Sequence, residues 1–248
     1  MYEERQADAN ARTAEVRAMR PSGESVSTAW RDRSCREELA SSWQVVCEHR
    51  NMPGGPEFVR APRSHRGPIH LAPPDPAWPQ QFAEVAVRIR HALGPVAVVV
   101  EHVGSTSVPG LAAKPFLDVL LLVPDPGDEA AYVPRLEAAG FLLHVREPDW
   151  YQHRFFRAHD PEVQIHAFAV GSEEAERMLL FRDRLRANVD ERALYEETKR
   201  RLAARSWTRV QDYADAKSEV VEEIIARADG GRIGSHRRPG RPEASSSR

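Results

Sequence analysis

A glycine–serine turn and a later aspartate are the residues of this chain whose types and spacing best suit chemistry. Gly104-Ser105 directly follows a β-branched run, and Asp118 stands inside a second apolar run. Glycine lets the backbone turn sharply and lets a ligand approach its amides, and a serine hydroxyl can donate a hydrogen bond to a phosphate oxygen. If the two runs are neighbouring strands, the turn and the aspartate meet at one edge of a sheet. The spacing therefore predicts a phosphate-binding turn beside a carboxylate that can hold a divalent cation.

Further polar side chains can complete this anion site. Lys114 can reach a phosphate as a point charge, and Ser107 lies in the same turn. Arg154 and Arg182 each stand beside a phenylalanine and are the predicted arginines for an anionic ligand. The alternative for each arginine is a surface or helix-packing role, and the alternative for Lys114 is a structural salt bridge to Asp118.

Two tyrosine–lysine pairs have the spacing of neighbours on a helix. They are Tyr195 with Lys199 and Tyr213 with Lys217. Side chains four residues apart lie on one helical face. Packing between helices and a sheet explains both pairs, so we predict no chemical role for them.

The second apolar run lacks one carboxylate of a complete metal site. Strand alternation puts Phe116, Asp118 and Leu120 on one face. Leu120, the next residue on that face, cannot bind a cation, which puts two-metal phosphoryl or nucleotidyl transfer in doubt. The sequence therefore argues against a two-metal centre.

A later strand offers a different second ligand for a metal. His166 shares a face with Gln164 there, and either Glu101 or His102, but not both, can point into the site. A carboxylate and an imidazole together suit Mg²⁺, Mn²⁺ or a transition metal. We predict one divalent cation, Mg²⁺ or Mn²⁺, between Asp118 and His166, with a satisfied core histidine as the alternative for His166.

The apolar pattern predicts the elements that position these residues. A helix is predicted to start at Asp75 or Pro76 and to end before Gly94-Pro95, with an apolar stripe at helical spacing from Trp78. Ser172, Asp190 and Val210 are the predicted starts of three C-terminal helices. Further apolar runs predict a helix over 129–139 and strands over 96–103, 116–123, 141–145, 154–157 and 163–170. The strand over 96–103 is expected to be buried on both faces.

Composition narrows the class of protein. The 248 residues carry a formal net charge of −2, which indicates no general affinity for nucleic acid. Membrane-spanning and signal-peptide patterns are absent from the sequence, so we expect a cytoplasmic protein. Residues 1–66 are polar and predicted to be a disordered leader, 67–229 the folded domain, and 230–248 a disordered tail. The oligomeric state stays open.

One string of residues resembles a known family. EHVGSTSVPGLAAKPFLDVLLLV, with DPAWPQQF upstream and LLFRDRLRAN downstream, is similar to the GrpB-like family over about residues 69–228. The resemblance implies the nucleotidyltransferase superfold, with a Gly-Ser turn followed by metal-binding acidic residues. Some members are fused to a dephospho-coenzyme A kinase, whose GxxxxGK(S/T) phosphate loop this chain lacks.

These observations predict an α+β fold, a nucleotidyltransferase-like mixed sheet with packed helices and a C-terminal helical part. The leading functional prediction is a metal-dependent nucleotidyltransferase-like protein that binds a nucleoside triphosphate, with Gly104, Ser105 and Lys114 on phosphates and Asp118 on the cation. The alternative is a catalytically inert module that binds a nucleotide or another phosphorylated small molecule on the same fold.

Overall fold

The structure is a computed structural model that describes residues 55–61, 67–207 and 210–233. Most of the predicted leader (1–54 and 62–66) and the predicted tail from residue 234 lie outside the described residues. Residues 55–61 contribute β1, a two-residue strand that pairs with the sheet. Helix α9 continues to Ile233, beyond the predicted start of the tail at Gly230.

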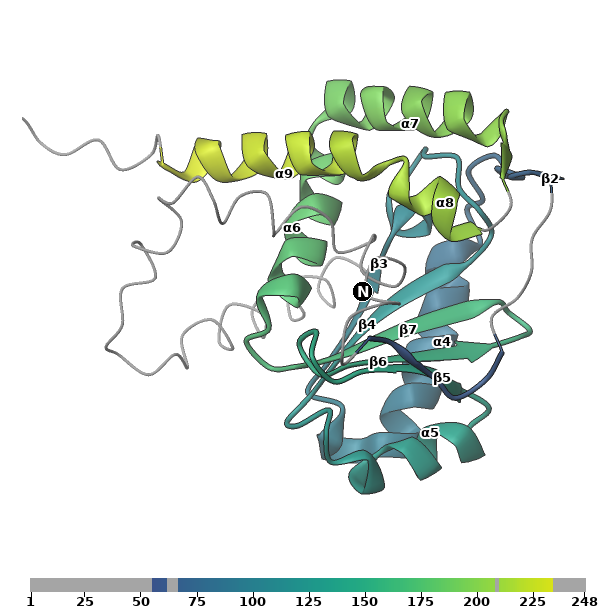
Figure 1. The fold of residues 1–248 in the computed structure, drawn as a ribbon, viewed down its shortest axis with the longest axis vertical. Helices are drawn as coiled ribbons and strands as arrows, with labels where there is room; N and C mark the ends of the chain where they lie inside the picture. Colours follow the sequence, from purple (N-terminus) through teal and green to yellow (C-terminus); the bar gives the residue numbers. More distant parts are fainter. Residues whose placement is uncertain (1–54, 62–66, 208–209, 234–248) are drawn as a thin grey trace, which may run out of the picture.

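A six-stranded mixed sheet forms the centre of the molecule, in the order β1-β5-β6-β7-β4-β3 (Figure 1). Strand β4 pairs antiparallel with β3 and parallel with β7, and the other pairs are antiparallel. Strand β3 is therefore an edge strand of the sheet. Val100 and Val103 lie on opposite faces of it and are both buried, which agrees with the expected burial of both faces. The bounds are β1 Glu57–Phe58, β3 Val99–Val103, β4 Leu117–Val123, β5 Leu142–Glu147, β6 His153–Ala158 and β7 Val163–Ala169.

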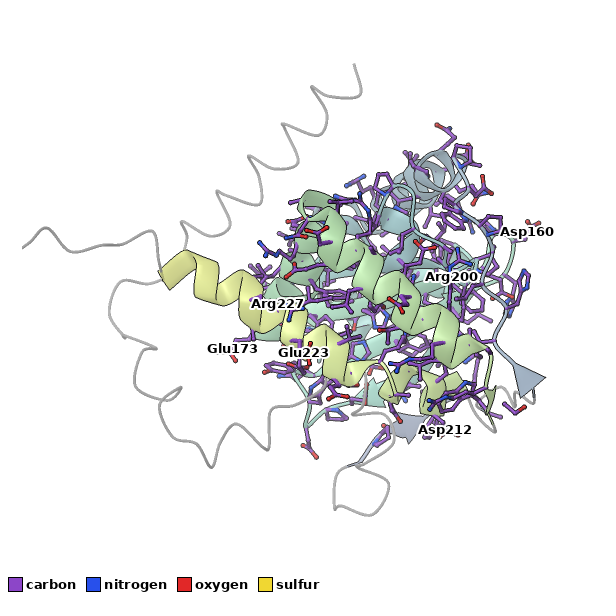
Figure 2. All side chains as sticks on the ribbon, turned by 90° about the horizontal axis from the view of Figure 1, so that it is seen from above. Asp160, Glu173, Arg200, Asp212, Glu223 and Arg227 are labelled. Carbon is purple, nitrogen blue, oxygen red and sulfur yellow. The ribbon has the colours of Figure 1, made fainter. Side chains whose placement is uncertain are left out.

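The helices form a layer on each side of this sheet. On one side lie α4 (Trp78–Leu93) and α5 (Val133–Ala138). The other side carries the C-terminal helices, which Figure 2 shows from above. Their bounds are α6 Glu173–Ala187, α7 Val189–Ala203, α8 Val210–Asp215 and α9 Ser218–Ile233. A small second sheet pairs β2 (Gly67–Pro68) with β8 (Ser206–Trp207).

Strand alternation divides the core between these layers. Val119 and Leu121 of β4 pack in the cluster that includes α4 and α5. Leu120 and Leu122 pack on the opposite face, against Met178 and neighbouring residues of α6. Asp118 has the parity of Leu120, so it faces the C-terminal helices. Among the described residues, the helices are either too short or too polar to cross a bilayer.

The helix starts are partly as the sequence predicts. Helix α4 ends as predicted, because Gly94 follows it with a positive φ of 57°, but it begins at Trp78 rather than at Asp75 or Pro76. Ser172 precedes α6, although its hydroxyl makes no capping hydrogen bond. Helix α7 is capped by Asn188, whose side chain accepts from the amides of Asp190 and Glu191, so Asp190 is not the cap.

Candidate functional site

The predicted turn and aspartate touch one another. Strands β3 and β4 pair with Val103 opposite Asp118, and Gly104 follows with φ 74°. A Cβ atom on residue 104 would lie 2.1 Å from Oδ2 of Asp118. Only glycine therefore permits the backbone to adopt this positive φ and the carboxylate to approach this closely.

The turn after Gly104 is a single 3₁₀ turn, η4 (Ser105–Ser107). The Thr106 hydroxyl donates to the Phe116 carbonyl at 3.0 Å, and the Ser107 hydroxyl donates to the Gly104 carbonyl at 2.7 Å. Both side chains are buried and hold the turn. Ser105 is partly exposed, so its hydroxyl is the one that a ligand can reach. The prediction of Ser107 as a phosphate contact stays untested, but its hydroxyl already has a partner.

All three lysines of the chain converge on this turn. The lysines are Lys114, Lys199 and Lys217, and the other 32 of the 35 lysine and arginine residues are arginine. The Nζ atom of Lys199 lies 3.3 Å from Oγ of Ser105 and also donates to the Ala112 carbonyl. Lys114 and Lys217 both act electrostatically on Asp118. We call these three lysines, with Ser105 and Asp118, the lysine cluster.

Two tyrosines form an aromatic wall of the lysine cluster. The Nζ atom of Lys199 lies 4.9 Å from the ring centroid of Tyr195. The Nζ atoms of Lys217 and Lys114 lie 4.8 and 5.5 Å from that of Tyr213. The faces of aromatic rings attract cations at such distances. The two pairs interpreted from the sequence as packing contacts therefore belong to the site.

Burial and mutual repulsion shift the pKa values of the cluster. Burial, helped by the charge of Lys217, lowers the pKa of both Lys114 and Lys199 to about 7. Burial lowers the pKa of Lys217 to about 8, although Asp118 opposes the shift. Burial also raises the pKa of Asp118 to about 6, against the effect of Lys114. All four groups therefore change protonation within the range where enzymes and binding proteins work.

Two residues of neighbouring strands complete the surroundings of Asp118. Gln164 of β7 lies opposite Asp118 in the parallel pairing, and Arg157 of β6 lies opposite Gln164. With the Gln164 amide oriented to satisfy both neighbours, its nitrogen donates to Oδ1 of Asp118 and its oxygen accepts from Arg157, each at 3.2 Å. Arg157 adds a fourth cation near the carboxylate.

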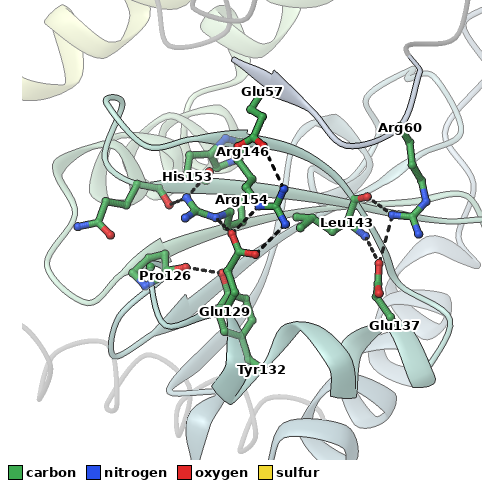
Figure 3. A network of polar contacts seen from close by, with 12 residues as sticks. Glu57, Arg60, Pro126, Glu129, Tyr132, Glu137, Leu143, Arg146, His153 and Arg154 are labelled. Carbon is green, nitrogen blue, oxygen red and sulfur yellow. Dashed lines mark hydrogen bonds and ion pairs between the residues drawn. The ribbon is translucent and has the colours of Figure 1, made fainter. Parts of the chain in front are cut away.

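The two arginines predicted for the ligand lie elsewhere. Arg154 is on the opposite face of β6, where its Nε donates to Glu129 at 2.6 Å (Figure 3). Arg182 is buried and donates to Glu101 at 2.7 Å and to Asp183 at 2.8 Å. Both are bound by carboxylates, so neither is brought into the lysine cluster.

His102 and Glu101 also separate by strand alternation. His102 stacks on Phe82 of α4 with ring centroids 4.6 Å apart, and its Nε2 lies 3.0 Å from the Thr106 hydroxyl. Glu101 faces α6, where it binds Arg182. As expected, only one of the two, Glu101, faces the Asp118 side of the sheet. Its carboxylate forms an ion pair with Arg182 of α6.

His166 lies in a buried chain of polar groups on the same face of the sheet as Asp118. Its Nδ1 is 3.2 Å from Nε2 of His153, whose Nδ1 is 2.6 Å from Oε2 of Glu147. His166 pairs with Leu120, one step along the face from Asp118. Within the described ranges, no group of three or more His, Cys, Asp or Glu is arranged to hold a metal. A cation between Asp118 and His166 stays a prediction, and the cations around Asp118 oppose it.

A small depression among the C-terminal helices ends at the glycine of the turn. It borders Gly104 and lies between α6 and α9. Its walls are largely apolar, with one acidic and one basic side chain. The lining side chains are Glu174, Arg177, Met178, Phe181, Val221 and Ile225. The turn is therefore approached along an apolar wall.

Sequence reasoning missed Lys199, Lys217, Tyr195, Tyr213 and Arg157. The tyrosine–lysine spacing was visible, but local spacing does not tell which way a helix faces. A stronger signal was the small number of lysines. Only three of the 35 lysine and arginine residues are lysine, and all three lie at the site. Lysine differs from arginine in that burial readily removes its charge.

An α+β domain with a lysine-lined Gly-Ser turn is the class that this fold and site define, and comparisons with known proteins identify the family. A family model described as GrpB protein matches residues 68–227. The chain therefore belongs to the GrpB family. A crystal structure described as conserved protein GrpB from Enterococcus faecalis aligns with a TM-score of 0.55 at 26% identity, over 66% of this chain and 99% of that chain.

Sequence relatives agree with this assignment. A UPF0157 protein of Halalkalibacterium halodurans is 52% identical over 167 residues, which is 67% of this chain and 86% of the relative. A UPF0157 protein of Streptomyces coelicolor is 44% identical over 72% of this chain and 90% of its own length. A protein of Mycolicibacterium paratuberculosis named dephospho-CoA kinase is 29% identical over 90% of this chain, which spans 61% of that protein.

Proposed function

We propose that this chain binds a nucleotide or another phosphorylated small molecule at the lysine cluster. The observation that carries the proposal is that all three lysines of the chain gather at the glycine–serine turn. Lys199 lies against Ser105, and Lys114 and Lys217 act on Asp118. Phosphate is the common cellular ligand whose charge matches several cations and whose oxygens accept from amines, hydroxyls and backbone amides. The partial exposure of Gly104 and Ser105 gives such a ligand a way in.

Charge balance supports an anion rather than a metal as the first ligand. Lys114, Lys217 and Arg157 all act on the single carboxylate of Asp118. A divalent cation placed there would be repelled by those charges, whereas a phosphate would be attracted and would raise the lysine pKa values again.

A metal-dependent nucleotidyltransferase is the second candidate. The contact between Gly104 and Asp118 favours it, because a carboxylate next to a phosphate-binding turn can hold a cation that bridges to the phosphate. The resemblance to the nucleotidyltransferase superfold and the relatives named dephospho-CoA kinase also support a nucleotide ligand. Leu120, where a second carboxylate would stand, is buried in the core and weighs against two-metal transfer.

Calorimetry tests the binding proposal. ATP, GTP, CTP, UTP and inorganic phosphate are titrated into the protein with and without Mg²⁺ or Mn²⁺. We expect Lys217→Met to lower the affinity about tenfold, since a charge-assisted hydrogen bond contributes roughly 1.5–3 kcal/mol. Arg200→Met is the matched control, because Arg200 is an exposed cation of α7 whose partner is Glu196. Absence of binding for the whole panel would reject the proposal.

Asp118→Asn separates the two candidates. In a binding module the variant keeps or gains affinity for the anion, because a nearby negative charge is removed. In a metal-dependent nucleotidyltransferase it abolishes turnover of the nucleoside triphosphates and the effect of Mg²⁺ or Mn²⁺ on binding. Product analysis by chromatography, run beside the calorimetry, distinguishes these outcomes.

A further inference from the structure

We infer that the Ser105 hydroxyl is a nucleophile that accepts a phosphoryl group from the bound ligand, and that Lys199 is its general base. This inference rests on the proposed phosphate site and goes beyond it, from binding to a covalent step. Its starting point is that Nζ of Lys199 lies 3.3 Å from Oγ of Ser105. A nucleophile and its base must lie within about this distance of one another.

Ser105 is the one hydroxyl of the η4 turn that is suited to this role. Thr106 donates to the Phe116 carbonyl, and Ser107 donates to the Gly104 carbonyl. Both are buried, whereas Ser105 is partly exposed. The Tyr195 hydroxyl also hydrogen-bonds the Ser105 side chain. The turn thus presents one accessible hydroxyl, which already lies between an amine and a phenol.

The Lys199 amine is held in place to act on that hydroxyl. Its side chain is 2% exposed, its Nζ donates to the Ala112 carbonyl, and the ring of Tyr195 lies beneath it. A neutral amine has two N–H bonds and one lone pair. With one N–H directed at Ala112, the lone pair is available to the Ser105 hydroxyl.

A lysine is required here because an arginine cannot act as a base near neutral pH. The guanidinium group stays protonated in proteins, while a buried amine beside other cations loses its proton readily. Burial and the charge of Lys217 bring the pKa of Lys199 to about 7. This explains why a chain rich in arginine has lysine at this position.

The step balances without any further reactant. As Oγ of Ser105 attacks the phosphorus atom, its proton passes to Nζ of Lys199. The new Oγ–P bond forms while the P–O bond to the leaving group breaks, and the leaving oxygen keeps the electron pair of that bond. Lys199 then gives its proton to the leaving oxygen. Lys114 and Lys217 are the cations that neutralise the phosphoryl oxygens during the step.

The bound phosphoryl group itself promotes the proton transfer. Its negative charge raises the affinity of the neighbouring amines for protons. The nearest proton to the Lys199 lone pair is the one on Ser105. The ligand therefore strengthens the base at the moment when the nucleophile needs to lose its proton.

Reaction with p-nitrophenyl phosphate tests the inference. This aryl phosphate is chosen because its leaving group departs without an acid and is coloured. We expect a burst of nitrophenolate that is stoichiometric with protein, and one phosphoryl group on the peptide that contains Ser105, detected by mass spectrometry. At limiting substrate concentration the burst reports the free protein, and its second-order rate constant should increase as pH rises through about 7, the pKa of Lys199.

Three variants locate the chemistry. Ser105→Ala and Lys199→Arg are expected to lose the burst and the phosphoryl group, and Lys199→Arg keeps a cation but no base. Ser172→Ala is the control, because Ser172 lies outside the lysine cluster at the start of α6. Thermal melts show whether each variant is folded, and the pH dependence of the native protein tests the base independently of any variant.

Two results would overturn the dyad. One is a native protein that binds inorganic phosphate in calorimetry but never carries a phosphoryl group on Ser105, which leaves the proposed binding function intact. The other is a Ser105→Ala burst equal to that of the native protein. Failure to bind inorganic phosphate or any nucleotide would instead reject the binding proposal.

Discussion

Two clusters of charged residues lie on opposite faces of the same sheet, and they are built from different cations. On the α5 side, Glu129 accepts from Nε of Arg146 at 2.7 Å and from Nε of Arg154 at 2.6 Å (Figure 3). On the α6–α9 side, Lys114, Lys217 and Arg157 act on the one carboxylate of Asp118, and Lys199 contacts Ser105 of the adjacent turn. We call the first group the arginine network.

The pKa values of the two carboxylates move in opposite directions. Burial alone would raise the pKa of Glu129, but the hydrogen bonds from Arg146 and Arg154 outweigh burial and lower it. Burial raises the pKa of Asp118 to about 6. The arginine network is thus charged and saturated with hydrogen bonds, as a structural contact should be. The lysine cluster is poised to gain or lose protons, which is typical of a functional site.

The largest expected effect comes from adding a side chain at Gly104, where the backbone approaches Asp118 most closely. Gly104→Ala places a Cβ atom 2.1 Å from Oδ2 and 2.8 Å from Cβ of Asp118 at a positive φ. Strain and overpacking together should destabilise the fold by about 3 kcal/mol, measured by urea unfolding. Gly110→Ala is the matched control, since Gly110 has φ 76° and open space, and should cost only about 1 kcal/mol. Equal losses for both variants would show that the close approach has no energetic importance.

Breaking the arginine network should have the next largest effect and should leave the ligand unaffected. Glu129→Gln removes the carboxylate that binds the buried Arg154 and the partly exposed Arg146. This leaves the buried Arg154 without a carboxylate and Arg146 with only its exposed contact to Glu57, which should cost about 2 kcal/mol of unfolding free energy. Glu57→Gln, at an exposed 3.5 Å contact to Arg146, should change it by less than about 0.5 kcal/mol. Loss of phosphate binding in a folded Glu129→Gln protein would contradict this division of roles.

Per pH unit, the smallest of these effects is a pH dependence of stability that belongs to the lysine cluster. The pKa of Lys199 falls from 10.5 to about 7 on folding, so between these values the unfolded chain holds more protons. Stability therefore rises with pH across this window, by up to about 1.4 kcal/mol per pH unit for each such lysine. We expect urea unfolding of Lys199→Met to show a shallower rise than the native protein. Parallel curves for the two proteins would mean that Lys199 is charged in the folded state.

Most of the fold and half of the site could be predicted from the sequence. The contact between the turn and Asp118 follows from two consecutive apolar runs, because a short connection between strands makes antiparallel pairing the simplest arrangement. The same local pattern could not tell an edge strand from a central one, since the β-branched run that forms β3 has the composition of either.

The cations of the site were harder to predict because their placement depends on parity and on tertiary docking. Arg154 and Arg157 are three residues apart on β6, so they face opposite sides of the sheet, and the sequence alone did not fix which side faces Asp118. Lys199 and Lys217 reach the turn only because α7 and the α8–α9 connection pack over it. No local spacing encodes such a long-range contact.

The lysine cluster spans two parts of the chain that are far apart in sequence. Lys114 and the turn lie in the connection between β3 and β4, whereas Lys199 lies on α7 and Lys217 lies between α8 and α9. Repulsion among the amines opposes the docking of those helices, and an anion bound among the amines cancels that repulsion. By mass action, a higher concentration of the ligand then lowers the fraction of molecules in which the helical layer has separated from the sheet.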